Sequence, residues 1–373
     1  MIGKVRIIPM CPVSWGQGVT KDVALLELTT ADGISGLGSA YTGSRQVLEA
    51  WKTYRRNPET LHKAQDEMAI PMSAIDIALW DIKGKKTGKS ISELLGGRQR
   101  DCILAYATVS LPLTTARPGD AFEQGVRSVM NLGFKAIKLS MAGFGHRNST
   151  RSDLEWDSYE AALLTFAREI VGPEFTLMLD VYGSDPNWSG SFDWALKTAR
   201  ILEKLGYLWL EEPLPPTATE EYIRLSLASG IAISGGEDFI ALKDFESWSA
   251  KRAVSILQPD CTRVGGLTPL HCIREAAHHH NIDLIPHGWN TAVGLAADLQ
   301  FQATTPEGRL CMVEYMPARH LEEPLKHDPF GLDHEGMIAV PTGPGLGVEL
   351  DNDRVEDGVG VFDCGEETIE LPW

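Results

Sequence analysis

Six short apolar segments in the second half of the chain each end in an acidic residue or a histidine. They end at Asp180, Glu211, Glu237, Asp260, His287 and Glu314, in the segments FTLMLD, LWLE, IAISGGE, SILQPD, IDLIPH and MVE. Carboxylates bind hard divalent cations, and imidazole moves protons near neutral pH. An isolated acid after a strand is usually a helix N-cap, but six residues in the same phase favour a shared site.

The spacing of these end residues indicates how they are brought together. They follow one another at intervals of 31, 26, 23, 27 and 27 residues. Each interval is about one strand plus one helix, which is typical of repeated βα units. Because all strands of a parallel barrel end at one face, we expect five carboxylates and one imidazole to converge on a single pocket.

The first three acids, Asp180, Glu211 and Glu237, predict a metal site. Three carboxylates cannot all be ionised in one pocket without a counter-charge, because like charges raise each other's pKa. An all-oxygen ligand set suits Mg²⁺, or Mn²⁺, better than zinc. We therefore expect one Mg²⁺ per subunit. The alternative is three acids that cap helices or form ion pairs separately.

The next two end residues, Asp260 and His287, predict a general base. Neighbouring strand ends place a carboxylate against one ring nitrogen of an imidazole, which fixes the tautomer and raises the basicity of the ring. Such a histidine acts as a base near neutral pH. The alternative is a histidine with a structural role.

The segment KAIKLS (135–140) predicts polar groups on another strand of the same barrel. Alternation along a strand places Lys138 and Ser140 on the inner face together with Ala136. We expect Lys138 to pair with a substrate carboxylate or with the metal-binding acids. Glu314 is expected either to hydrogen-bond the substrate or to cap the segment that follows it.

The elements that carry these residues divide the chain into a barrel and a smaller module. Strand-like runs over 4–9 and 22–30, a further strand in ADGISGLGSAY and helical periodicity from Met72 to Ile82 predict an α+β module. The sequence ISELLGG is expected to end a helix at its glycines.

The domain limits follow from where the βα pattern begins and stops. We predict an α+β capping domain over residues 1–101 and a (β/α) barrel over 102–320. A turn-rich C-terminal segment, 321–373, is expected to return to the capping domain.

The composition of the 373 residues excludes several classes of partner. A hydrophobic content of 43% is that of an ordinary globular protein, and a net charge of −17 argues against nucleic acid. No apolar run approaches the ~18 residues of a membrane span, and MIGKVRIIPM lacks a signal-peptide core. The six cysteines are scattered without a CxxC pair. We therefore expect a cytoplasmic protein with reduced thiols and no membrane contact.

The motifs KAIKLS, LMLD, LWLEEP, GGED, LQPD, IPHG and MVEY, in this order, resemble the mandelate racemase branch of the enolase superfamily. SAIDIALWDIKGKKTGKSISELLGG resembles the helical part of that family's capping domain, and GPGLGVEL its C-terminal return. The resemblance spans nearly the whole chain. It implies a modified (β/α)7β TIM-type barrel with an α+β capping domain formed by the N-terminal part and the C-terminal tail.

The resemblance also implies roles for the residues that match by position. The Mg²⁺ ligands would be Asp180, Glu211 and Glu237. His287 with Asp260 would be the family's His–Asp dyad. Glu314 would be the acid that interacts with the developing enolate.

The sequence departs from this family at Ser140. The family's second strand often reads Lys-x-Lys, and its second lysine is a base on one side of the substrate α-carbon, whereas this chain has Lys138-Leu139-Ser140. One base disfavours racemisation, but β-elimination needs no second base. His287 can remove the α-proton and protonate the departing 3-hydroxyl on the same face. The rhamnonate dehydratase group resembles this chain in lacking that lysine.

We therefore expect a carbon–oxygen lyase, a Mg²⁺-dependent dehydratase that converts a sugar acid, aldonate or aldarate, to a 2-keto-3-deoxy acid. The alternatives are a sugar-acid cycloisomerase or a racemase or epimerase of the same superfamily. An alternative of another class is a catalytically inactive metal-binding barrel. The expected assembly is a homo-oligomer, from dimer to octamer.

Further side chains are candidates for substrate contacts. Tyr182 stands where the resembled family frequently has Asn, and Trp289 follows His287 by two positions. The others are Trp15 and Tyr41, in capping segments that close over the barrel mouth in that family, and His146, in the loop FGHRNSTRSD. Each of these aromatic residues is otherwise a packing residue, and the loop is otherwise a solvated surface loop.

Overall fold

A computed structural model describes most of the chain. The described residues are 2–14, 20–62, 68–111, 120–141, 153–185, 188, 190–289, 291–316, 325–327, 329–358 and 362–363. Trp15 and His146 lie outside these residues, so the expectations for their side chains remain predictions.

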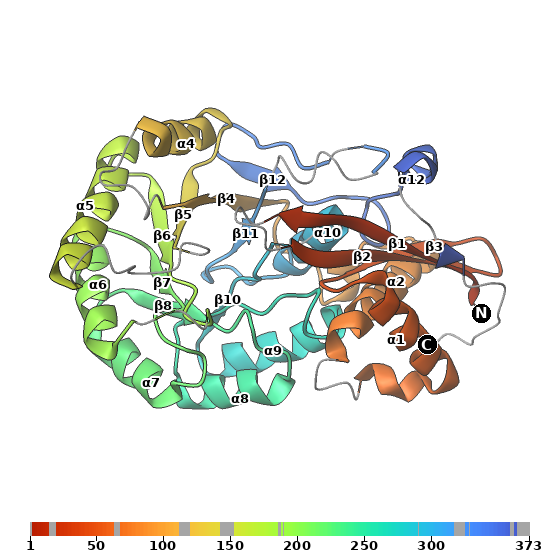
Figure 1. The fold of residues 1–373 in the computed structure, drawn as a ribbon. Coiled ribbons are helices and arrows are strands. Elements are labelled where there is room, and N and C mark those ends of the chain that lie inside the picture. The colour runs from red at the N-terminus through yellow and green to blue at the C-terminus, as the bar shows by residue number, and fades with distance from the viewer. Residues whose placement is uncertain are drawn as a thin grey trace.

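The N-terminal part is an antiparallel sheet covered by helices (Figure 1). Its strands are β1 (Ile2–Ser14), β2 (Thr20–Thr30) and β3 (Ser35–Ala40), and its helices are α1 (Ser44–Arg56), η1 (Pro58–His62), α2 (Ala69–Thr87) and α3 (Ile91–Leu94). The predicted strands and the predicted helix are confirmed. The short helix α3, with the sequence ISEL, begins with a Ser90–Glu93 capping box and ends just before the left-handed Gly96 and Gly97, as predicted. The longer helix α2 ends at Gly88, with φ 69°.

Helix α2 packs unusually close to β3 because the strand has glycines at the contact. A Cβ atom on Gly38 would overlap the carbonyl oxygen of Ala74, and one on Gly36 would overlap that of Ala78. Only glycine permits this approach of helix backbone to strand backbone.

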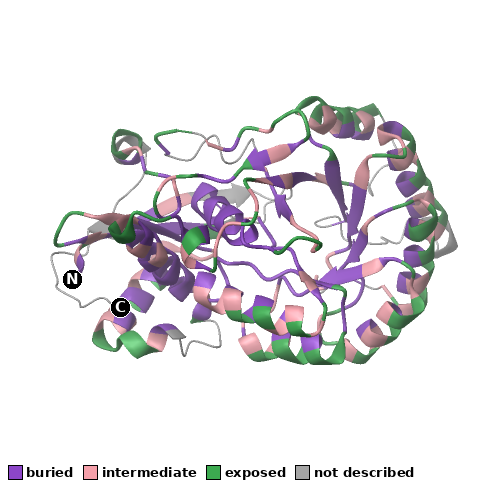
Figure 2. Ribbon diagram, turned by 180° about the vertical axis from the view of Figure 1, so that it is seen from behind, coloured by how far each residue is buried: buried purple, intermediate pink, exposed green. Residues whose placement is uncertain are grey.

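The rest of the chain alternates strands and helices, and its parallel strands have the order β10-β9-β8-β7-β6-β5-β4-β11. The strands are β4 (Cys102–Ser110), β5 (Ala136–Ser140), β6 (Thr176–Asp180), β7 (Trp209–Glu211), β8 (Ala232–Gly235), β9 (Ile256–Leu257), β10 (Asp283–Leu284) and β11 (Met312–Glu314). The helices between them are α4 (Asp120–Asn131), α5 (Asp153–Val171), α6 (Phe192–Lys204), α7 (Thr219–Ala228), α8 (Leu242–Lys251), α9 (Leu267–His279) and α10 (Ala292–Gln302). This is the expected (β/α)7β arrangement. Figure 2 shows buried strands inside a ring of helices whose outer faces are exposed.

The barrel has a small interior core of its own. Tyr106, Ala136, Met178, Trp209, Ile256, Ile285 and Met312 pack together inside the strands. The alternate residues Ile137 and Leu139 belong to the core between strands and helices. Strand alternation therefore puts Lys138 and Ser140 on the inner side, as predicted.

One seam of the barrel lacks a hydrogen-bonded ladder within the described residues, between β10 and β11. The side chain of Gln302, at the end of α10, bridges it. Its Nε2 donates to the carbonyl oxygens of Leu284 on β10 at 3.3 Å and of Met312 on β11 at 2.9 Å.

The C-terminal segment contacts both parts of the fold. β12 (Met337–Ala339) pairs with β4, and β13 (Phe362–Asp363), after α12 (Asn352–Gly358), pairs with β1 of the capping sheet. The domain limits predicted above remain predictions. Among the described residues, no helix is both long and apolar enough to cross a membrane.

Candidate active site

The strand ends carry the predicted residues, although three strands are shorter than expected. β6, β7 and β11 end at Asp180, Glu211 and Glu314. β8, β9 and β10 stop two or three residues before Glu237, Asp260 and His287, which therefore stand on the loops that leave the barrel. The physical cause lies in the preceding residues. Gly236 has a left-handed φ of 102°, and Pro259 and Pro286 have no N–H group for a ladder.

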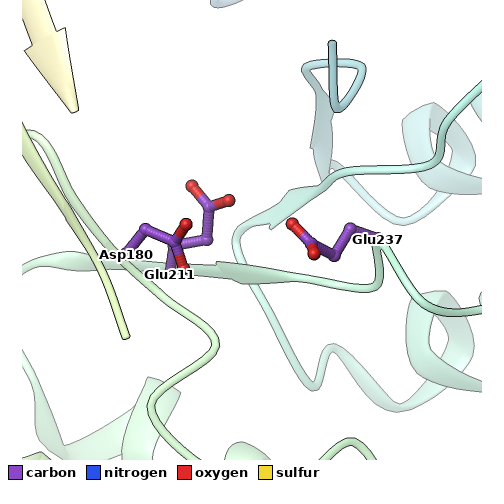
Figure 3. Close-up of side chains that lie close together, drawn as sticks. All are labelled: Asp180, Glu211 and Glu237. Carbon is purple, nitrogen blue, oxygen red and sulfur yellow. The ribbon is translucent and has the colours of Figure 1, made fainter. Parts of the chain in front are cut away.

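Asp180, Glu211 and Glu237 form a group able to hold a metal ion. One carboxylate oxygen from each lies within 4.8 Å of the others, and Figure 3 shows the Glu237 carboxylate pointing towards the other two. Burial raises the pKa of Asp180 well above its ordinary value, and the neighbouring Glu211 adds to this. Burial also raises the pKa of Glu237. The repulsion among the buried carboxylates and their all-oxygen donor set suit a hard divalent cation.

Lys138 is the cation next to this cluster. Its Nζ lies 2.8 Å from Glu211 Oε1, 3.6 Å from Asp180 Oδ2 and 3.6 Å from Glu314 Oε1. Burial alone would lower the pKa of Lys138, but Glu211 and Glu314 raise it well above its ordinary value. The surrounding carboxylates therefore favour the charged form of this lysine.

His287 and Asp260 form the predicted pair. His287 Nδ1 lies 2.9 Å from Asp260 Oδ2, and His287 Nε2 lies 3.6 Å from Glu237 Oε2. Burial alone would lower the pKa of His287, but Glu237 and Asp260 outweigh it and raise the pKa to about 9. Asp260 keeps a low pKa in spite of burial because His287 and Thr262 hydrogen-bond it. With Nδ1 held by Asp260, Nε2 is the ring nitrogen that faces the acidic cluster.

Glu314 is held on the other side of the lysine. Thr108 Oγ1 donates to its Oε1, and the Gly288 N–H donates to its Oε2 at 3.1 Å. Burial would raise the pKa of Glu314, but Lys138, His287 and Thr108 lower it. The carboxylate is therefore fixed in place by two donors and one cation.

These side chains surround a cavity of ≈ 20 Å³. It is lined by Thr108, Lys138, Ser140, Asp180, Tyr182, Glu237, His287, Trp289 and Glu314. Larger clefts lie elsewhere, but this one is lined by Asp180 and Glu237 of the acidic cluster together with Lys138 and His287.

Of the other residues predicted to contact substrate, some line this cavity and one does not. Ser140, Tyr182 and Trp289 line the cavity, and Tyr182 has a left-handed φ of 57° while its N–H donates to Asp180 Oδ1 at 2.9 Å. Tyr41 is not among the lining residues. Its N–H donates to the Thr262 carbonyl oxygen on the loop between β9 and α9.

Several residues of the site were not predicted from the sequence. Trp209 Nε1 donates to Glu211 Oε2 at 2.9 Å, and strand alternation would have placed both Trp209 and Thr108 inside the barrel. Glu212, with φ 41°, is buried within 4.8 Å of Glu237 and Asp238. Nothing in the sequence separates Glu212 from an exposed acid after a strand.

Family models and known proteins match most of this chain. The family model described as the mandelate racemase / muconate lactonizing enzyme N-terminal domain matches residues 4–96, and the one described as enolase C-terminal domain-like matches 121–354. A D-galactarolactone cycloisomerase from Agrobacterium fabrum is 34% identical over 77% of this chain and 73% of its own length. A D-galactonate dehydratase from Variovorax paradoxus is 29% identical over 91% of this chain and 86% of its own.

A solved structure shares the whole fold. An L-talarate dehydratase from Polaromonas, complexed with Mg and L-glucarate, superposes with a TM-score of 0.78 at 25% identity, covering 98% of this chain and 99% of that one.

Proposed function

Because the chain belongs to the mandelate racemase and muconate lactonizing enzyme family of the enolase superfamily, we propose that it is a Mg²⁺-dependent dehydratase of a sugar acid. The substrate would be an aldonate or an aldarate, and the product a 2-keto-3-deoxy acid. The observation that carries the proposal is the convergence of three carboxylates, one buried lysine and one His–Asp dyad on a single cavity.

Asp180, Glu211 and Glu237 would hold the Mg²⁺. When bound, the ion would neutralise the substrate carboxylate and make the adjacent C–H bond more acidic. The chemistry of the donor set supports this assignment, since three buried carboxylates lie close together and offer only oxygen ligands.

His287 would remove the proton next to the substrate carboxylate. Such a proton is too weakly acidic for imidazole alone, so the negative charge that develops must be stabilised by fixed groups. Lys138 offers a buried ammonium that would stabilise this charge. Glu314, held by Thr108 and Gly288, would donate a hydrogen bond to it only in its protonated form. Enzymes of this superfamily use a histidine or a lysine as the base, together with bound Mg²⁺.

The same imidazole would complete the elimination. As imidazolium, His287 would return its proton to the departing 3-hydroxyl, so both groups would leave from one face. Ser140 supports this assignment, because a serine on β5 supplies no base for the opposite face.

A cycloisomerase is the second candidate, and the 34% identity to D-galactarolactone cycloisomerase favours it. The same site would then expel a ring oxygen instead of a hydroxyl, and the product would keep all atoms of the substrate. A racemase or epimerase has less support, since it needs acid–base groups on both faces.

A screen of mono- and diacid sugars and of their lactones tests these proposals. The expected result is formation of a 2-keto acid with loss of one water by mass, abolished by a chelator and restored by Mg²⁺. A 2-keto acid with unchanged mass would identify the cycloisomerase. Metal binding without turnover of any acid sugar would support an inactive barrel instead.

A further inference from the structure

The loop between β9 and α9, residues 258–266, lies between the dyad and the capping domain. Asp260, near the start of the loop, belongs to the dyad, and the end of the loop contacts helix α2 of the capping domain. Thr262, completely buried, stands in the middle of this loop. The mechanism proposed above gives this residue no role.

Thr262 donates two hydrogen bonds to one oxygen of Asp260. Its N–H and its Oγ1 both donate to Asp260 Oδ1 at 2.7 Å. The other oxygen, Oδ2, meets His287 Nδ1 at 2.9 Å. Since a carboxylate is planar, two donors on Oδ1 fix the plane in which Oδ2 accepts from the ring. The orientation of Thr262 therefore sets the direction of His287 Nε2.

The capping domain holds the same residue from the other side. The Tyr41 N–H donates to the Thr262 carbonyl oxygen at 3.1 Å. The guanidinium of Arg263 lies 5.6 Å from the Tyr41 ring, and its Nη2 binds Asp238 Oδ1 at 2.7 Å. A continuous chain of hydrogen bonds thus runs from Tyr41 through Thr262 and Asp260 to His287.

Helix α2 fixes the far end of the loop. Ser73 Oγ accepts from the Gly265 N–H at 2.9 Å. Asp76 accepts from the N–H and the Oγ1 of Thr268, in the first turn of α9, at 2.9 and 2.7 Å. The N-terminus of α9 is thus capped by a carboxylate from the capping domain rather than by its own chain.

We propose that Thr262 is a positioning residue through which the capping domain sets the orientation of the His287 base. The inference rests on the proposed function only in calling His287 a base. The hydrogen-bonded chain itself is a property of the free protein that holds for any reaction.

The first test needs no substrate. In protein labelled with ¹⁵N-histidine, His287→Asn identifies the proton resonance of His287 Nδ1–H, which the bond to Asp260 should shift downfield. Thr262→Val removes the Oγ1 donor without changing the shape of the residue, and should move or broaden that resonance. Thr262→Ser should restore it. Thr30→Val is the matched control. It removes the bond of another buried threonine, to the Ile34 carbonyl oxygen at 3.1 Å in the turn between β2 and β3, and should leave the resonance unchanged.

The second test uses a substrate found by the screen. Thr262→Val should lower kcat by ~10–100-fold with little change in KM, as loss of an outer hydrogen bond to a working group commonly does. Thr262→Ser should recover most of the rate. Ser73→Ala, on the capping domain, should lower kcat less, and its effect should be non-additive with that of Thr262→Val.

The outcomes separate the inference from the function. If the resonance responds to Thr262→Val while no acid sugar is turned over, the positioning role stands and the proposed reaction fails. If turnover is found but Thr262→Val leaves both kcat and the resonance unchanged, the positioning role is wrong. Strictly additive effects of Ser73→Ala and Thr262→Val would overturn the link to the capping domain. Should Thr262→Val not fold, Thr262→Ala carries the same test.

Discussion

At the scale of single residues, the side chains of the site differ in whether they keep a fixed charge or exchange a proton. Lys138, surrounded by three carboxylates, remains an ammonium, and Glu314, held by two donors, remains a carboxylate. In the metal-free protein the pKa of His287, about 9, keeps the ring mostly protonated at neutral pH, so the ring must lose this proton before it can act as a base. Binding of a cation at Glu237 would weaken the interaction that raises this pKa.

His287→Asn should abolish turnover and leave metal binding nearly intact. Asparagine keeps a hydrogen-bonding group opposite Asp260 but cannot accept a proton, so kcat should fall by ~10²–10⁴-fold or more. Titration with Mn²⁺, followed by its EPR signal, should give the same stoichiometry as the wild type. Fast turnover by this variant would show that the base lies elsewhere.

Ser140→Lys tests the face opposite to His287. A lysine there restores the base that the related pattern contains, yet it should not speed the elimination, because departure of the 3-hydroxyl depends on His287. It should instead introduce slow exchange of the α-proton with solvent, measured by deuterium incorporation into unreacted substrate. A faster elimination would mean that the two groups leave from opposite faces.

At the scale of elements, the sequence predicts whether a segment is a helix or a strand better than it predicts where that element ends. Alternation and spacing were enough to assign β5, β6 and β7 and the inward direction of Lys138, because these strands run to the functional residue itself. The early ends of β9 and β10 follow from Pro259 and Pro286, a signal that was present in the sequence.

Other features had no local signal. The capping of α9 by Asp76 joins residues 192 positions apart, and the left-handed Glu212 is held by backbone hydrogen bonds with Ser234 and Gly183. Local propensity cannot report such contacts, because they form only when distant parts of the chain pack together.

Gly38→Ala should destabilise the capping domain. The added Cβ would meet the carbonyl oxygen of Ala74, so helix α2 must move away from β3, at a cost of ~1–3 kcal/mol or more. Gly125→Ala in α4 is the control. Its Cβ meets nothing within 4 Å, and a helical Gly→Ala change should stabilise by ~0.5–1 kcal/mol. Denaturant unfolding of both variants measures the difference, and equal stabilities would contradict the close packing.

At the scale of the whole molecule, we expect the acidic site to make the stability of the folded protein depend on pH and on a bound divalent cation. The pKa values of His287, Asp180 and Glu237 are all raised on folding, so the native state binds more protons than the unfolded one. Stability must then fall as pH rises. For His287 the loss runs from about its ordinary 6.5 to about 9 and amounts to roughly 3 kcal/mol.

The metal-free protein should therefore unfold more easily at pH 9 than at pH 6, and Mg²⁺ should stabilise it more at the higher pH. Unfolding in urea, with chelator or with Mg²⁺, measures both effects. His287→Asn should lose part of the pH dependence and keep the part that comes from the acids. A metal-free protein whose stability rises from pH 6 to 9 would contradict the charge assignment.

At the seam between β10 and β11 the described residues are joined through side chains, whereas the other neighbouring strands of the barrel are joined by backbone hydrogen bonds. Across it the described hydrogen bonds and ion pairs are those of the Gln302 amide, the pair of Arg309 with Asp283, and the bond from Gly288 to Glu314. An opening of the wall at this seam would break only bonds that involve side chains. His287, after β10, and Glu314, at the end of β11, lie on opposite sides of this seam. A small opening of the wall would therefore widen the ≈ 20 Å³ cavity between them and leave every strand ladder intact.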